Sequence, residues 1–149
     1  MQIRKIRKTL AILPLVLAIP NGWTQDLKNE YVPTEKTAWY RESPRFPVQL
    51  AALWGDRVKG EAGTLLTTPP GFKSGVHSHT ADYRAIVVRG TWKHWVPSTG
   101  EGNGVTLQPG AYWTQVHTQL HADACVSKTP CVIFLFNKDP YVTEFPAAK

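Results

Sequence analysis

From Val48 onward the sequence consists of short runs of strand-forming residues that end at glycine, proline or other turn residues. The runs are QLAALWGD, GEAGTLLTTPPGF, YRAIVVRGTWKHWV, VTLQPGAYWTQV and CVIFLF, the last apolar throughout and therefore expected to be buried. No stretch after residue 26 shows a long apolar period of 3.6 residues, and no internal repeat is present. Many short strands at close spacing predict an all-β sandwich, jelly roll or barrel.

Residues 1–25 have the layout of a signal peptide. The start MQIRKIRK is basic and contains no acid, and the apolar run LAILPLVLAI follows it. A transmembrane anchor is the alternative, although the run has only about half of the roughly 20 residues that a spanning helix needs. We expect an exported protein, periplasmic or secreted, with no membrane association after the signal has been removed.

The length of 149 residues leaves room for one domain with one hydrophobic core. Residues 26–47 are polar and irregular and contain several prolines, which predicts an N-terminal arm. The arm is expected either to pack on the domain or to pair with a neighbouring subunit. Residues 48–149 are predicted to form the β domain itself.

The charge of the chain gives no support to nucleic-acid binding. The formal net charge is +6, but four of the basic residues lie in MQIRKIRK. Without them 13 basic residues face 11 acidic ones, so the mature chain carries a charge of about +2. Nucleic-acid binding needs a clustered basic face, and the sequence contains none. The expected partner is a small-molecule substrate or ligand.

The histidine pair in GVHSHTADY is the most informative local feature. Alternate side chains of a strand point to the same face, so His77 and His79 are expected to project together. Two imidazoles placed in this way can share one cation, and His121 in QLHADAC is the candidate for a third ligand from another strand. Taken alone, the pair also fits two histidines on a wet strand surface.

Cys125 and Cys131 are separated by VSKTP, whose polar, proline-containing composition suits a hairpin turn. Opposed residues of antiparallel strands lie at a distance that a disulfide can bridge, and an exported protein meets oxidising conditions. A disulfide is therefore a candidate. Two half-buried free thiols, or Cys125 facing the metal pocket, are the alternatives.

The spacing around the histidines resembles the two motifs of the cupin superfamily. The first motif reads G-x5-H-x-H-x3,4-E-x6-G and the second reads G-x5-P-x-G-x2-H-x3-N. The positions that agree are Gly71, His77, His79, Gly90, Gly110 and His121. The resemblance implies a single cupin domain, an antiparallel jelly-roll β-barrel, with one metal ion near its mouth.

The departures from these motifs bear on the site. Tyr83 stands at the Glu position of the first motif, and Val116, Thr118 and Cys125 stand at the Pro, second Gly and Asn positions of the second. Strand parity places Tyr83 on the same inward face as His79. It could ligate as a phenolate, donate a hydrogen bond to a bound oxygen ligand, or serve only as a wall of the pocket.

The wider pattern looks like a cupin branch that contains acetylacetone-cleaving dioxygenases and the cupin domain of ChrR-type anti-sigma factors. In the dioxygenases three histidines hold a non-haem ferrous ion. The resemblance implies one divalent transition metal, Fe²⁺ or Zn²⁺, on His77, His79 and His121. It also suggests a dioxygenase, an oxidoreductase that cleaves a small chelating anionic compound such as a β-dicarbonyl.

In the dioxygenase interpretation Trp92 and Trp113 form the pocket wall, and Gln115 or Tyr83 orients the substrate or oxygen. His117 is assigned to the pocket, as a contact to the site or as a fourth ligand, and an exposed position in a turn is the alternative. His94 is expected at the surface or at the rim of the pocket.

The alternative function is a non-catalytic periplasmic module that binds zinc or a small molecule, or acts as a sensor. An isomerase or lyase without a redox metal, and a cupin that has lost its metal, also remain open. The family resemblance makes a homodimer an expectation, in which the arm could be exchanged between subunits.

Overall fold

The computed structural model describes residues 28–147, so the predicted signal peptide lies outside the described residues. The chain divides into two units, Met1–Tyr31 and Val32–Lys149. In the first unit only residues 28–31 are described, and they contain no helix or strand. Every element below belongs to the second unit. No helix formed by residues 28–147 has the length and apolar character needed to cross a membrane.

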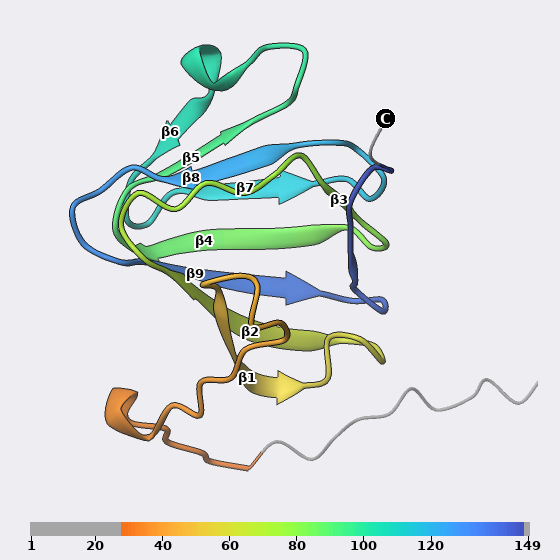
Figure 1. Cartoon of the computed structure of the whole chain (residues 1–149). Helices are drawn as coiled ribbons and strands as arrows, with labels where there is room; N and C mark the ends of the chain where they lie inside the picture. Colours follow the sequence, from red (N-terminus) through yellow and green to blue (C-terminus); the bar gives the residue numbers. More distant parts are fainter. Residues whose placement is uncertain (1–27, 148–149) are drawn as a thin grey trace, which may run out of the picture. The chain divides into compact units, whose positions relative to one another are not determined.

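The second unit is built almost entirely from antiparallel strands (Figure 1). The strands are β1 (Gln49–Gly55), β2 (Ala62–Thr68), β3 (Ser78–His79), β4 (Tyr83–Arg89), β5 (Trp92–Trp95), β6 (Val105–Leu107), β7 (Tyr112–Gln115), β8 (Ala122–Cys125), β9 (Cys131–Asn137) and β10 (Thr143–Glu144). Two short 3₁₀ turns accompany them, η1 (Thr34–Lys36) and η2 (Glu101–Asn103).

The strands form a five-stranded sheet in the order β1-β2-β9-β4-β7 and a three-stranded sheet in the order β6-β5-β8. A short pair, β10-β3, adds a third piece. The run CVIFLF becomes β9, which pairs on one side with β2 and on the other with β4. Its central place explains why it is apolar throughout. The predicted all-β jelly-roll domain is confirmed.

The core lies on the inner faces of the two larger sheets. Along β4 the residues Tyr83, Ala85 and Val87 are buried and alternate with exposed neighbours, as a strand that covers a core on one face requires. Ile133 and Leu135 of β9 join the same cluster. The alternation fixes which face of each strand reaches the interior, and the candidate site residues follow the same rule.

The arm packs on its own domain from residue 40 onward. Tyr40 and Leu50 exchange two backbone hydrogen bonds, of 2.9 and 2.8 Å. The ring of Phe46 stacks on that of Phe145 with centroids 5.6 Å apart. The arm therefore meets the segment that follows β9, although the two are far apart in the sequence.

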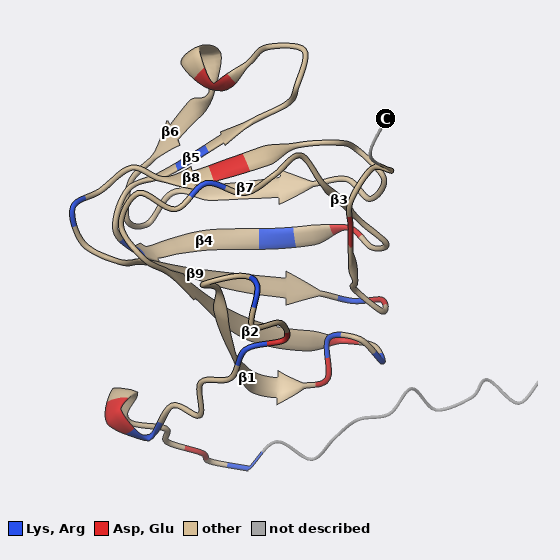
Figure 2. Cartoon of the chain, viewed as in Figure 1, with Lys and Arg blue, Asp and Glu red and all other residues tan. Residues whose placement is uncertain are grey.

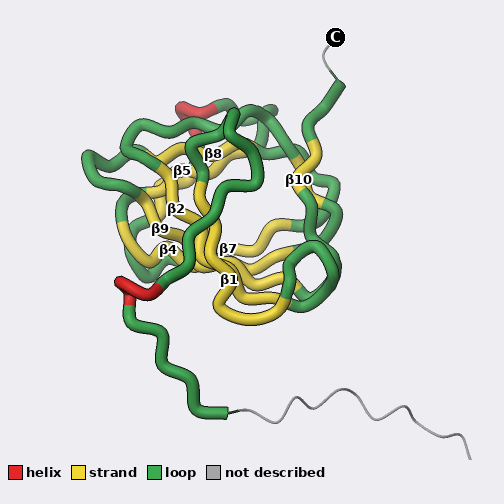
Figure 3. Tube along the Cα trace, turned by 60° about the horizontal axis from the view of Figure 1, so that its bottom comes forward, coloured by secondary structure: helices red, strands yellow, loops and turns green. Residues whose placement is uncertain are grey.

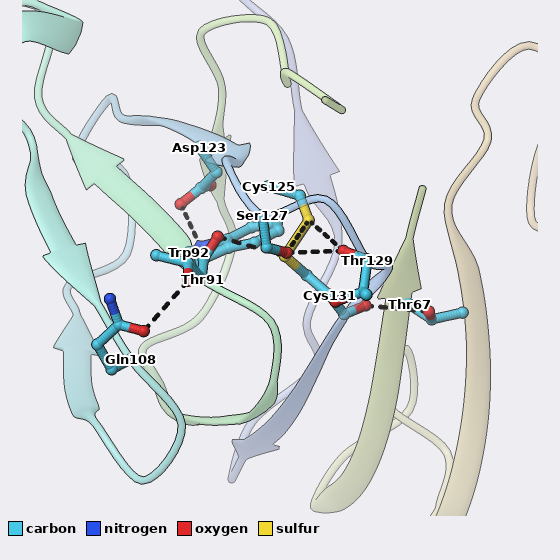
Figure 4. Close-up of a disulfide and its surroundings, with 9 residues drawn as sticks. All are labelled: Thr67, Thr91, Trp92, Gln108, Asp123, Cys125, Ser127, Thr129 and Cys131. Atoms are coloured by element: carbon cyan, nitrogen blue, oxygen red, sulfur yellow. Dashed lines mark hydrogen bonds between the residues drawn. A yellow bond between two sulfur atoms is a disulfide. The ribbon is translucent and has the colours of Figure 1, made fainter. Parts of the chain in front are cut away.

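Cys125 and Cys131 form a disulfide that joins the end of β8 to the start of β9 (Figure 4). Because β8 belongs to the three-stranded sheet and β9 to the five-stranded sheet, the bond ties the two sheets together. Gly90 crosses at the same place, with a φ of +83°, and an added Cβ would lie 2.7 Å from the Cys131 sulfur. This end of the barrel is filled and closed.

Charged residues of both signs are scattered over the strands and loops in the view of Figure 2. One example is the exposed pair of Lys59 with Asp56, in the turn between β1 and β2. That nucleic acid is not a partner stays a prediction from the sequence.

Candidate metal centre

The three predicted ligands meet at the end of the barrel opposite the disulfide. His77 and His121 face each other as an antiparallel bridge, and their backbones exchange two hydrogen bonds of 2.9 Å. His79 lies two residues along on the same face, in β3. All three side chains are buried, and one ligand atom from each lies within 4.8 Å of the others.

Backbone carbonyls fix the tautomers of two of these rings. The Nδ1 of His77 lies 2.8 Å from the carbonyl oxygen of Gly75, and the Nδ1 of His121 lies 3.0 Å from that of Gln119. A carbonyl only accepts, so each Nδ1 carries a proton, and in the neutral tautomer each Nε2 keeps its lone pair. The Nε2 of His121 is buried and has no hydrogen-bond partner among residues 28–147.

His79 has a different environment, because Tyr141 closes over it. The two rings stack with centroids 4.3 Å apart, and the Tyr141 hydroxyl forms a hydrogen bond of 2.9 Å with the His79 Nε2. Burial, with the neighbouring His77 and His121, lowers the pKa of His79 to about 2. Burial also lowers the pKa of His121 to about 4, against the opposing charge of Asp123. Both rings are therefore neutral near pH 7, as metal binding requires.

Asp123 brings a carboxylate to the edge of the cluster, two residues after His121 on the same face of β8. Its Oδ1 accepts hydrogen bonds from Trp92 Nε1 at 3.0 Å and from His94 Nδ1 at 2.7 Å. Its Oδ2 lies 3.7 Å from the Nε2 of His77 and 3.8 Å from that of His121. One oxygen is thus held in place while the other faces the histidines.

His94 is part of this network, so of its two expected positions, the surface and the rim of the pocket, the surface is wrong. Burial lowers the pKa of His94, but hydrogen bonds to Asp123 and Gln115 and the charge of Asp123 outweigh burial and leave the pKa raised. Its Nε2 lies 3.0 Å from the Gln115 Oε1. Gln115 therefore contacts His94, and the cavity described below does not include it.

His117 lies outside the site, so the assignment to the pocket is wrong. Its side chain is 54% exposed, and its Nδ1 and backbone NH both lie 2.7 Å from the Asp82 Oδ1. Val116 to Leu120 form an exposed turn after β7, which carries the His117 ring away from the barrel interior. The alternative of a turn-exposed histidine describes its position.

A cavity of about 350 Å³ opens beside the histidines. Figure 3 shows the course of the strands around the barrel. His77, His79 and Asp123 line it together with three predicted pocket residues, Tyr83, Trp92 and Trp113. The Tyr83 hydroxyl accepts a hydrogen bond from Trp113 Nε1 at 3.3 Å. Burial raises the pKa of Tyr83 well above its usual value, which disfavours ligation as a phenolate.

The donor set fits a divalent transition metal. Two Nε2 lone pairs point into the cluster with their Nδ1 atoms held by carbonyls, which is how metal-binding histidines are oriented in proteins. A buried, unpartnered nitrogen such as the His121 Nε2 has a free-energy cost that a metal–nitrogen bond would remove. Imidazole ligands suit zinc, iron, copper and nickel, so the ligands do not select one metal.

Three residues of this end were missed by the sequence analysis: Asp123, Tyr141 and Arg57. Asp123 could have been found from the sequence, because it lies two residues after His121, the third predicted ligand, and therefore shares its strand face. Tyr141 and Arg57 had none, because they come from segments before and after the motif region and reach the cavity only through the folded barrel.

The comparisons with known proteins agree with this architecture. The family model described as Domain of unknown function (DUF4437) matches residues 44–129, which include all three histidines. No curated protein sequence matches the chain.

Several solved structures have a similar fold. An RmlC-like cupin protein from Ralstonia eutropha is 18% identical with a TM-score of 0.61, over 82% of this chain and 78% of that one. The polyketide cyclase RemF from Streptomyces resistomycificus is 13% identical with a TM-score of 0.64, over 82% and 88% of the two chains.

A chain in the structure of Rhodobacter sphaeroides SigE in complex with the anti-sigma ChrR is also similar. It is 15% identical with a TM-score of 0.56, over 71% of this chain and 51% of that one. At these identities the likeness concerns the fold alone. The motif spacing, the jelly-roll strands and the family match lead to one assignment: the chain has the cupin fold and belongs to the family described as Domain of unknown function (DUF4437).

Proposed function

We propose that this cupin is a metal-dependent enzyme acting on a small, chelating, anionic compound such as the enolate of a β-dicarbonyl. The observation that carries the proposal is the buried, unpartnered Nε2 of His121 in a three-histidine cluster beside a cavity. A divalent ion held by His77, His79 and His121 would supply Lewis-acid and template chemistry to the oxygens of the compound. Neutral imidazoles leave the charge of that ion uncancelled, which favours an anionic ligand.

The residues of the chain itself would position the compound and keep water out. Tyr83, Trp92 and Trp113 provide aromatic walls, and the apolar Leu66 and Leu135 line the cavity further in. Burial holds the Tyr83 hydroxyl in its protonated form, so it can donate one hydrogen bond to an oxygen of the ligand. Oxygen-dependent cleavage of a β-dicarbonyl on ferrous iron is the first reaction to test.

A second candidate is a non-catalytic module that holds zinc, and Asp123 favours it. With three histidines and one carboxylate oxygen the chain could provide four ligands, and zinc sites with four protein ligands are structural. The Oδ2 of Asp123 lies within 4 Å of two of the three histidines. The choice between the two functions thus depends on whether Asp123 binds the metal or only supports its ligands.

The compartment belongs to the same proposal. The basic and apolar layout of residues 1–25 predicts export, and a disulfide between Cys125 and Cys131 is stable in the oxidising conditions outside the cytoplasm. We therefore propose that the protein works in the periplasm or after secretion. Assembly as a homodimer stays a prediction.

The metal content of the mature protein, purified without chelator, tests the proposal. We expect about one equivalent of a transition metal in the wild type and a loss of at least about a hundredfold in metal affinity in His121→Ala, because one of three ligands is removed. His117→Ala is the matched control, since it removes an imidazole from the same loop region but outside the cluster.

The metal then decides between the candidates. Iron, together with oxygen uptake that depends on acetylacetone or a related β-dicarbonyl, supports the dioxygenase. Zinc without turnover of any such compound supports the binding module and contradicts the enzyme. If no metal binds to the wild type after reconstitution, the metal centre itself is wrong.

A further inference from the structure

Arg57 is the least expected side chain in the wall of the cavity. It lies in the turn between β1 and β2, and it is the only Lys or Arg among residues 28–147 that is buried, at 8% exposure. Of the described residues that line the cavity, among them His77 and His79, it is also the only basic one other than histidine. A buried cation costs free energy unless it is paired, so its partners have to be identified.

The position of Arg57 is firmly held by the barrel. Its backbone oxygen accepts from Tyr141 NH at 2.7 Å and from the Asn137 side-chain amide at 3.3 Å. Its guanidinium lies over the ring of Tyr141, with Cζ 5.2 Å from the centroid, and donates to the Tyr141 carbonyl oxygen at 3.3 Å. The same Tyr141 ring stacks on His79, so a single ring contacts both the guanidinium and a predicted metal ligand.

The anionic partner of Arg57 is held much less firmly. Glu42 of the arm accepts from the Arg57 Nε at 3.1 Å and from its Nη2, a two-bond fork. Its side chain is 44% exposed, and the carboxylate has no other hydrogen-bond partner among the described residues. Glu42 lies at the edge of the cavity in a segment without regular secondary structure. One member of the pair is fixed and buried, while the other can return to water.

We propose that Arg57 anchors the carboxylate of the substrate and that Glu42 occupies this anchor in the free protein. A guanidinium binds any carboxylate in the same two-bond geometry, so an incoming carboxylate can replace Glu42 without leaving the buried cation unpaired. Such a ligand would place its carboxylate at Arg57 and its metal-binding oxygens at the histidines. The apolar walls between these two points suit the carbon chain that joins them.

This inference rests on the proposed function for the end of the ligand that binds the metal. It narrows the substrate class to small compounds that carry a carboxylate at one end and chelating oxygens at the other. The anchor at Arg57 requires no metal and can be tested separately.

The first experiment uses pentanoate and its neutral analogue pentanamide, with binding to the metal-free full-length mature protein followed by calorimetry. We expect the wild type to prefer pentanoate by about tenfold, the usual effect of a charge-assisted pair of hydrogen bonds. Arg57→Met should abolish the preference. Glu42→Gln should strengthen pentanoate binding and leave pentanamide unchanged, because it removes the internal competitor.

Asp56→Asn is the matched control. It removes a negative charge from the residue next to Arg57, but Asp56 pairs with the exposed Lys59 and does not line the cavity. Its affinity for pentanoate should equal that of the wild type. Equal binding of pentanoate and pentanamide by the wild type, or weaker binding of pentanoate by Glu42→Gln, would overturn the proposal. Weaker binding by Glu42→Gln would mean that the Glu42–Arg57 pair only holds the arm against the domain.

The second experiment joins the two ends of the ligand. Succinylacetone carries a β-diketone and a carboxylate, and its methyl ester has the diketone alone. With zinc bound, the wild type should prefer succinylacetone to its ester, and Arg57→Met should bind both equally while retaining its zinc. A wild type that binds zinc but shows no such preference contradicts the substrate class. If the wild type prefers pentanoate yet binds no zinc, the metal centre fails while the anchor stands.

Discussion

The two ends of the barrel interior are built from the same strands but serve different purposes. Along β8 the inward residues are His121, Asp123 and Cys125, so one strand face passes from a predicted metal ligand to a disulfide within five residues. At the disulfide end Cys125 and Cys131 are almost fully buried. At the mouth a buried imidazole nitrogen has no partner, and a guanidinium and a carboxylate are buried nearby.

The difference shows where this small domain can carry groups that cost stability. Buried polar groups lower the free energy of unfolding unless they are satisfied, and a domain of this size has only a small margin. The closed end contributes a covalent bond and apolar packing around Val87 and Ile133. Changes at the closed end should therefore affect folding, and changes at the mouth should affect binding.

The largest effect is expected at the closed end, for Gly90→Ala. The residue has a φ of +83°, and the new Cβ would lie 2.7 Å from the Cys131 sulfur and 2.9 Å from its Cα. Backbone strain and overpacking together should lower the free energy of unfolding by about 3 kcal/mol. Urea unfolding measures it. Gly102→Ala, where nothing lies within 4 Å, is the control. A variant as stable as the control would remove the contrast between the two ends.

The next effect is expected at the mouth, for Asp123→Asn. The amide still accepts from Trp92, but it replaces a carboxylate oxygen near His77 and His121 with a neutral group. We expect zinc affinity to fall by about tenfold, or about 1.4 kcal/mol, if Asp123 only supports the ligands. Competition with a fluorescent chelator measures the affinity, and the exposed Asp82→Asn is the control. A loss as large as that of His121→Ala would make Asp123 a ligand.

The smallest expected effect is a gain in the free energy of unfolding, and it concerns Thr118. Thr118 has a φ of +61° and stands where the cupin motif has its second glycine. Thr118→Gly should raise the free energy of unfolding by about 1 kcal/mol, since a β-branched residue is strained in this conformation. Thr114→Gly in β7 is the control and should lower it. A loss of stability in Thr118→Gly would mean that the turn holds no strain.

The sequence could predict the β class, the jelly roll and the meeting of the three histidines, because strand parity and motif spacing are local. His121 was expected as a third ligand from another strand, and the structure places it directly opposite His77. The role of His94 was missed, since its burial depends on Asp123 reaching it from the neighbouring strand. For His117 the sequence left both the pocket and an exposed turn open, and the exposed turn after β7 is the position it takes.

The other wall of the cavity was beyond sequence reasoning. Arg57 lies in what the sequence shows as a polar turn with Asp56 and Lys59, and nothing local separates the buried cation from its exposed neighbours. Its partner Glu42 and the covering Tyr141 come from segments 15 and 84 positions away. Such contacts depend on the arrangement of the sheets, which no residue pattern records.

The disulfide between Cys125 and Cys131 also has a mechanical consequence. It joins the two large sheets at the same end where Gly90 carries the chain from β4 to β5. A covalent bond therefore keeps the sheets together at this end, whereas at the mouth they are held by hydrogen bonds and loops. We expect a reducing agent to loosen the closed end without changing any residue of the site.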